Sequence, residues 1–203
     1  DFPLTSVAVA VEKQAVQTSK SSLEIPTVSK ELYLKTRESL AKEGYTFVVN
    51  IEPSSIGQLV TGEATSQCFG YVNPSENMRA IVPPQMEVAI NPKILRIPNS
   101  NRKSTDAQIE MIKKEEAILK NKLPQGIRDI VNMSMQNASV LAQTNFKYKE
   151  ATGKAFFTND KFGGFFGGGW FGATDDQTSS GRVAFVGRYS APRGLYIGDT
   201  SRA

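Results

Sequence analysis

Hydrophobic and polar positions follow a helical period in three stretches of the chain. In the first stretch, over residues 29–43, apolar side chains gather on one side and charged side chains on the other. Ser29 is suited to cap the N-terminus of this helix, and Gly44 is suited to follow its C-terminus. The apolar side is formed by Leu32, Tyr33, Thr36, Leu40 and Ala41. The pattern predicts a helix over 29–43 that buries one face.

Two further helical stretches, separated by Pro124-Gln125-Gly126, predict an αα-hairpin over residues 105–144. Thr105 and Gln108 have the spacing of a capping box at the start of the first helix. Its apolar stripe contains Ile109, Ile112 and Leu119. The apolar face of the second helix is expected to contain Ile127, Ile130, Val131, Ala138, Leu141 and Ala142. The opposite face is expected to be solvated and contains Arg128, Asn132, Gln136 and Gln143.

Shorter stretches have the composition of strands. Residues 45–51, YTFVVNI, are rich in β-branched and aromatic residues and predict a buried strand. Between residues 52 and 98, short apolar runs are separated by Pro and Gly, which predicts short, irregular strands with the character of sheet edges. Residues 7–11 are expected to form a docked strand, and residues 182–190 a strand with a bulge at Gly187.

Together these elements predict an α+β protein. It would contain a small irregular antiparallel sheet, one helix, an αα-hairpin, and long extended N- and C-terminal segments. We expect an extended N-terminal arm at 1–25, an α+β body at 26–144 that ends in the αα-hairpin, and a Gly/aromatic-rich extended C-terminal region at 145–203. No apolar run approaches the roughly 18 residues that a membrane-spanning helix needs, so no transmembrane segment is predicted.

The most unusual stretch is KFGGFFGGGWFG at residues 161–172, which contains six glycines and five aromatic residues. Burying one large apolar side chain contributes about 1.5–3 kcal/mol, and ordering the backbone of one residue costs about 1–2 kcal/mol. Over the whole stretch the two sums are comparable. The segment is therefore not expected to hold one shape alone, and needs a preformed surface on which to dock.

The candidate contact residues of this segment are its aromatic side chains, which are favoured anchors at protein interfaces. They are Phe162, Phe165, Phe166, Trp170 and Phe171. Four uses are open: a loop that completes the protein's own core, insertion into an apolar groove of a partner, stacking on single-stranded nucleic acid, and shallow insertion at a membrane interface. The sequence does not decide whether the segment docks on its own chain or on a partner.

Residues that commonly carry catalytic chemistry are scarce. The chain has no histidine, which excludes Ser-His-Asp triads, Cys-His dyads and His-ligated metals. Its single cysteine, Cys68, cannot form an internal disulfide or a structural zinc site alone. Cys68 is expected to be a small, partly buried residue, and the alternative hypothesis is a covalent attachment point for a prosthetic group or a reactive thiol. No catalytic residue, metal ligand or other cofactor site is predicted, because no constellation of Asp, Glu, Lys, Tyr or Ser stands out.

Charge and composition narrow the choice of partner. The net charge of +4 favours acidic partners, although no long run of Lys and Arg is present. The best hypothesis is a non-enzymatic structural or linker subunit that docks extended and aromatic-glycine segments onto other protein subunits of a larger assembly. In composition alone the chain is similar to the basic linker proteins of light-harvesting antennae, without their repeat-domain signatures, so no family is identified.

Two alternatives stay open. A basic nucleic-acid-associated component of a ribonucleoprotein is the first, supported by lysines around the aromatic segment: Lys147, Lys149, Lys154 and Lys161. An enzyme of unknown type that uses carboxylate or lysine chemistry is the second. A chain that begins at Asp1 is compatible with removal of a leader, and hence with an organelle (plastid or mitochondrion) or with export.

Overall fold

The computed structural model describes residues 8–12, 29–63, 66–73, 76–94, 97–100, 103–154, 171–177, 183–190 and 194–200. In chain order its elements are β1 (Ala8–Glu12), α1 (Lys30–Lys42), β2 (Phe47–Ile51), α2 (Ile56–Thr61), a 3₁₀ helix (Ser66–Cys68), β3 (Phe69–Val72), α3 (Glu76–Ala80), β4 (Met86–Ile90), α4 (Thr105–Lys122), α5 (Gln125–Arg128), β5 (Asn132–Ser134), α6 (Ala138–Thr152), β6 (Phe171–Gln177), β7 (Val183–Ser190) and β8 (Gly194–Thr200).

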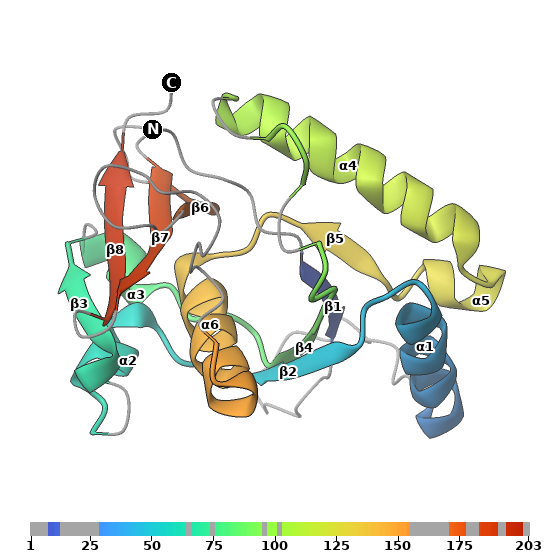
Figure 1. Ribbon diagram of the computed structural model, residues 1–203, viewed down its shortest axis with the longest axis horizontal. Coiled ribbons are helices and arrows are strands. Elements are labelled where there is room, and N and C mark those ends of the chain that lie inside the picture. The colour runs from blue at the N-terminus through green and yellow to red at the C-terminus, as the bar shows by residue number, and fades with distance from the viewer. Residues whose placement is uncertain are drawn as a thin grey trace, which may run out of the picture.

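The strands form two four-stranded sheets (Figure 1). In the first sheet the order is β2-β4-β1-β5, and all neighbours are antiparallel. In the second the order is β3-β8-β7-β6, where β3 and β8 are parallel and the other pairs antiparallel. Each pairing in the second sheet contains a register shift. The predicted α+β class with irregular strands is confirmed.

Helix α1 agrees closely with the pattern that predicted it. The Ser29 side chain accepts a hydrogen bond from the Leu32 amide at 3.2 Å, and this caps the N-terminus. Gly44 follows the helix with a φ of +92°, in the left-handed region that glycine tolerates best. Thr36 and Leu40 are the buried residues of the helix. Local signals alone therefore fixed both ends of α1.

The first sheet is buried on both faces, which is clearest in β4. Met86, Val88 and Ile90 point into one hydrophobic cluster, with α6 and the second sheet. Ala89 points to the opposite face of the strand and belongs to a second cluster with α1, α4 and α5. All five residues of β4 are buried, including Glu87. β4 therefore lies between the two hydrophobic clusters and contributes side chains to both.

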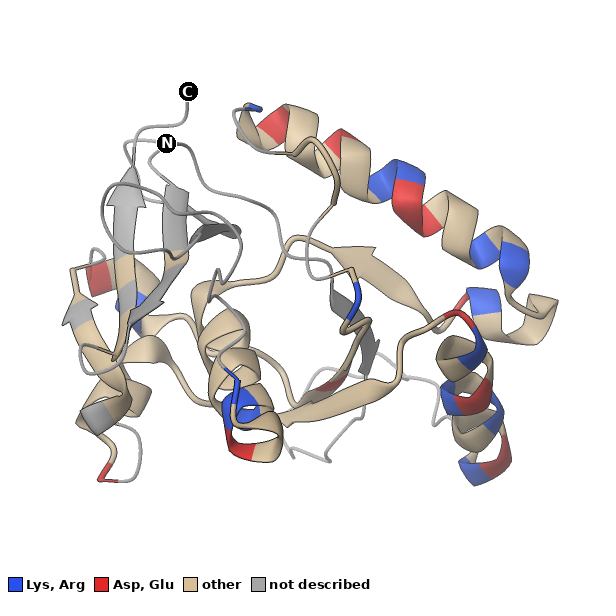
Figure 2. Cartoon of the chain, viewed as in Figure 1, with Lys and Arg blue, Asp and Glu red and all other residues tan. Residues whose placement is uncertain are grey.

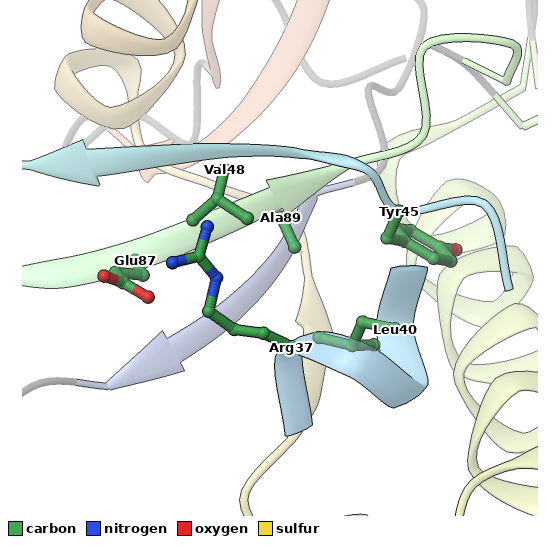
Figure 3. A pocket seen from close by; sticks show the side chains of 6 residues that line it. All are labelled: Arg37, Leu40, Tyr45, Val48, Glu87 and Ala89. Atoms are coloured by element: carbon green, nitrogen blue, oxygen red, sulfur yellow. The ribbon is translucent and has the colours of Figure 1, made fainter. Parts of the chain in front are cut away.

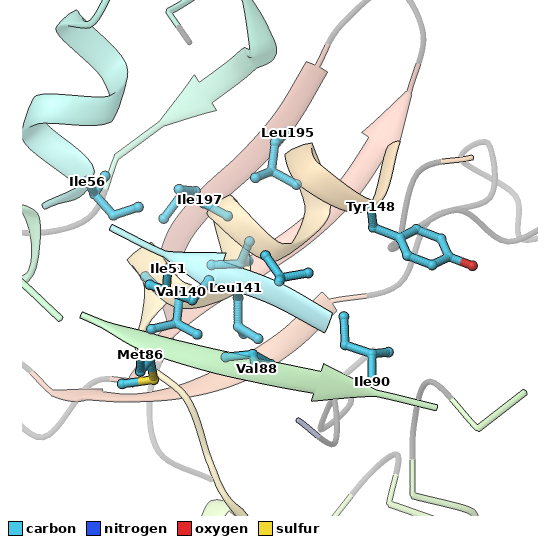
Figure 4. Packing of buried hydrophobic residues seen from close by; sticks show 14 of the residues in the cluster. Ile51, Ile56, Met86, Val88, Ile90, Val140, Leu141, Tyr148, Leu195 and Ile197 are labelled. Atoms are coloured by element: carbon cyan, nitrogen blue, oxygen red, sulfur yellow. The ribbon is translucent and has the colours of Figure 1, made fainter. Parts of the chain in front are cut away.

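Helix α6 lies between the two sheets (Figure 1) and supplies the centre of the first cluster. Figure 4 shows side chains from β2, β4, α6 and the second sheet meeting around this helix. The buried residues of the cluster are Val49, Ile51, Ile56, Met78, Met86, Val88, Ile90, Ala138, Val140, Leu141, Ala142, Tyr148, Val186, Leu195 and Ile197. Because two sheets and a helix share these contacts, the second sheet is fixed to the first through α6.

The second half of the predicted αα-hairpin is wrong. Residues 127–144 do not form one helix: α5 ends at Arg128, β5 follows, and α6 begins only at Ala138. The backbone of residues 132–134 pairs with β1, so sheet pairing overrides the helical period of the sequence. Asn137 then caps α6 by accepting a hydrogen bond from the Val140 amide at 2.9 Å. The apolar residues of this stretch consequently divide between the two cores.

Two side chains assigned to a solvated face are also buried. Gln136, which precedes α6, is 5% exposed and donates from Nε2 to the Ser134 carbonyl at 3.0 Å. Gln143 is 3% exposed, because α6 has protein on nearly all sides at this point. At the start of α4 the N-cap is Ser104, not Thr105, and Gln108 donates to the Lys103 carbonyl. The proposed division into an arm, a body and a C-terminal region stays a prediction, although α6 runs across the boundary at residue 144.

Candidate functional site

Most of the aromatic-glycine segment lies outside the described residues. Phe162, Phe165, Phe166 and Trp170 fall in this part of the chain. Phe171 is described through its backbone as the first residue of β6, opposite Gly187 of β7. The structure therefore places the C-terminal end of the candidate segment directly in a strand.

The two ends of this part of the chain are both attached to the core. On the N-terminal side α6 ends at Thr152 and is capped by Gly153, whose φ of +72° is left-handed and whose amide donates to the Lys149 carbonyl at 2.8 Å. On the C-terminal side β6 pairs with β7, and β7 pairs with β8. Val186 of β7 and Leu195 and Ile197 of β8 are fully buried in the cluster around α6. The segment thus connects two well-anchored elements, and β6 is the last strand in the order of its sheet.

Cys68 ends the 3₁₀ helix just before β3 and is a free, half-buried cysteine. Its backbone is in close contact with Gly194, which has a φ of +74°. A Cβ atom added to Gly194 would lie 2.6 Å from the Cys68 carbonyl oxygen, so only glycine fits there. This contact fixes the backbone of Cys68 against the start of β8. Covalent attachment of a prosthetic group at its thiol stays a prediction.

The structure also shows a polar cluster that the sequence analysis missed. Glu87 is 3% exposed, and its two carboxylate oxygens lie 2.6 and 2.7 Å from the Tyr33 hydroxyl, which donates to them. Arg37, one turn along α1, approaches the same hydroxyl with Nη1 at 3.4 Å, and its guanidinium carbon lies 5.8 Å from the centre of the Tyr33 ring. The signal in the sequence was a single carboxylate within the apolar run MEVAI.

A small cavity lies beside this cluster, between α1 and the first sheet (Figure 3). It is lined by Arg37, Leu40, Tyr45, Val48, Glu87 and Ala89. Its volume of about 10 Å³ is close to the smallest that holds one water molecule. The site can therefore hold a water between charged and apolar walls, and it is too small for an organic substrate.

Burial, together with smaller contributions from the nearby carboxylates of Glu115 and Glu43, raises the pKa of Tyr45 to about 12. The neutral phenol is thus the stable form of this side chain over the whole physiological range. Figure 3 shows Tyr45 at one end of the cavity and Glu87 at the other. Tyr45 therefore forms an uncharged wall of the cavity opposite the Glu87 carboxylate.

Charged side chains of both signs are interspersed along α1 and α4 (Figure 2). Three ion pairs along these helices join Glu31 to Lys35, Glu110 to Lys113 and Glu116 to Lys120. Within the described ranges, no group of three or more His, Cys, Asp and Glu side chains could hold a metal ion. Among the described helices, none is both long enough and apolar enough to cross a membrane.

Comparison with protein-family models, with curated proteins and with solved structures finds no significant match to this chain.

Proposed function

We propose that this protein is a non-enzymatic structural or linker subunit, and that its aromatic-glycine segment docks onto a partner protein in a larger assembly. The observation that carries the proposal is the position of residues 161–172. They run directly into β6, the last strand in the order of the second sheet. A segment that is fixed at its end loses less conformational freedom on docking than a free tail does.

The anchoring of the second sheet supports this function. Val186, Leu195 and Ile197 are fully buried against α6, so the strand that receives the segment belongs to a rigid sheet. The aromatic rings of the segment, Trp170 above all, would provide the apolar contacts. The net charge of +4 favours partners with an acidic surface.

The partner can be identified by photo-crosslinking. A photo-reactive phenylalanine analogue would replace Phe166 in the full-length chain within its native source, and a second chain would carry it at Ile118. Ile118 lies on α4 and is 51% exposed, so it serves as a matched control outside the segment. Docking on a partner predicts a discrete intermolecular product from position 166 and none of that mass from position 118. Crosslinks from position 166 confined to the chain itself would indicate docking on its own core.

A double variant then measures the energy of docking. Phe166→Ala with Trp170→Ala should weaken binding to the crosslinked partner by at least about 2 kcal/mol, the scale of an interface hot spot. Urea unfolding of the free variant should change much less. Leu34→Ala with Ile118→Ala, which removes two exposed apolar side chains, is the control. A strong shift in unfolding with unchanged binding would contradict the proposal, and a loss of affinity for single-stranded nucleic acid alone would favour the ribonucleoprotein alternative.

A further inference from the structure

Strand β2 combines a terminal position with a sequence that favours self-pairing. Among the described strands of the first sheet, β2 has one neighbour, β4. Residues 45–51, YTFVVNI, contain aromatic and β-branched residues and neither a charge nor a proline. Segments of this composition readily add to strands of other chains when they lie at a sheet edge. Such an edge is usually covered or interrupted in a stable protein.

Helix α6 covers the C-terminal end of this edge with two side chains. Gln143 accepts a hydrogen bond from the Glu52 amide at 2.9 Å through Oε1, and donates to the Glu52 carbonyl at 2.9 Å through Nε2. Its side-chain amide thus takes the place of a neighbouring strand. Lys147, one turn later, donates from Nζ to the Asn50 carbonyl. The backbone groups of every second residue point to the same side of a strand, so those of residues 50 and 52 both point away from β4. These bonds therefore occupy two consecutive outward-facing positions of the edge.

The orientation of Gln143 is fixed by its surroundings. It is 3% exposed, and its Nε2 lies 3.2 Å from the Ser139 hydroxyl. That hydroxyl in turn donates to the Ser54 carbonyl. Lys147 is held less tightly, since its side chain is 36% exposed and its Nζ lies 3.9 Å from the Glu52 carboxylate. Gln143 is therefore the rigid part of the cover and Lys147 the part that can move away.

We propose that Gln143 and Lys147 form an edge lock on β2, and that this edge, once unlocked, pairs in antiparallel fashion with β2 of a second copy of this chain. A second copy fits because residues 45–51 are uncharged, so two such strands meet without repulsion between like charges. Antiparallel pairing of identical edges also closes about a two-fold axis. The lock keeps β2 out of self-association.

The test compares the parent chain with Gln143→Leu/Lys147→Ala by sedimentation velocity over a wide range of concentrations. The double variant should self-associate as concentration rises, whereas the parent should not change its state. Lys154→Ala is the matched control, because it removes the same charge from an exposed position just beyond α6. Lys147→Ala alone opens part of the lock, and this variant should associate more weakly than the double variant but more than the parent. If the double variant does not fold, the comparison of Lys147→Ala with the parent tests the proposal.

Two further measurements locate the effect on the edge. The Glu52 amide should exchange its hydrogen slowly in the parent and faster in the unlocked variants under conditions where both are monomeric. Val48→Pro added to the double variant should abolish association. By the alternation of backbone groups along β2, the Val48 amide points away from β4, so proline removes a donor from the free edge and leaves the pairing with β4 intact. The proposal is overturned if a folded variant with a fast-exchanging Glu52 amide does not associate, or if Lys154→Ala associates equally.

Discussion

Helices α4 and α6 contact the same sheet but are held in opposite ways. α4 has eight charged side chains, and its residues alternate between exposed and buried positions. α6 has charged residues only in its C-terminal half, and each residue from Ala138 to Asn145 is buried (Figure 2). Each helix also contacts one edge of the first sheet: Glu116 of α4 accepts from the Met133 amide at 3.4 Å, and α6 holds β2.

The difference lies in where the partners of each helix come from. Several polar groups of α4 pair within the helix or with residues next to it, as in the Glu116–Lys120 ion pair at 2.8 Å. The polar groups of α6 pair with residues far away in the chain, as Gln143 does with Glu52. Solvent supports the polar face of α4, whereas the polar face of α6 depends on the rest of the fold. Mutations should therefore affect α6 more.

The largest difference is expected for apolar side chains. Leu141 of α6 is 1% exposed at the centre of its cluster, so Leu141→Ala should lower the free energy of unfolding by about 2–5 kcal/mol. Ile118 of α4 is 51% exposed, and Ile118→Ala should stay within about 0.5 kcal/mol. Urea unfolding of both variants checks this. Equal effects would mean that α6 is not the common centre of the two sheets.

Buried glutamines provide the next comparison. Gln143→Leu removes both partners of the Glu52 backbone and should cost about 2 kcal/mol, since each unsatisfied group costs about 1–3 kcal/mol and part of this is recovered from water. Gln108→Leu in α4 removes a bond to the carbonyl of the exposed Lys103, which water can replace, and should cost less than about 1 kcal/mol. Urea unfolding at low protein concentration would measure both. A larger loss for Gln108→Leu would contradict the proposed difference in dependence on distant partners.

Helix caps should show the same order with smaller values. Asn137 is half-buried and accepts from the Val140 amide at 2.9 Å, and Ser104 is exposed and accepts from the Ala107 amide at 3.3 Å. Asn137→Ala should cost about 1–2 kcal/mol, and Ser104→Ala should fall near the lower limit of about 0.5 kcal/mol. Thermal unfolding of the two variants and the parent tests the order. The reverse order would show that α4 depends on its cap more than on packing.

The same contrast explains which parts of the fold the sequence predicted. α1 and most of α4 followed from caps, apolar periodicity and charge, which all act within a few residues. The end of α5, β5 and the start of α6 could not be predicted in this way. Residues 132–134 form a strand only because they pair with β1, which lies more than a hundred residues earlier in the chain. One local signal was available: no charged residue occurs between Met133 and Phe146, which is unusual for a helix with a solvated face.

The candidate sites also differ in how far they could be predicted from the sequence. Cys68 and the aromatic-glycine segment were noticed because their residue types are unusual in themselves. The contact between Tyr33 and Glu87 joins α1 to the middle of β4, and the contact between Gln143 and Glu52 joins α6 to the end of β2. Neither pair has a fixed spacing that a pattern could detect. They became visible only when the sheet brought distant elements together.

The smallest expected effect concerns Tyr45, where the Glu115 carboxylate of α4 adds a lesser contribution to the effect of burial. The folded-state pKa of about 12 lies above the ordinary value of 10.0, so the neutral phenol stabilises the folded protein. This contribution is complete below pH 10 and is lost as the pH rises through about 12. Because burial is the main cause and Glu115 a lesser one, Glu115→Gln should lower the pKa only slightly and leave unfolding at pH 7 unchanged. The phenolate absorbance of the parent, of Glu115→Gln and of Tyr45→Phe isolates this one titration. If Tyr45 titrated near 10 in the folded parent, its side chain would not be buried, and it could not form one wall of the cavity.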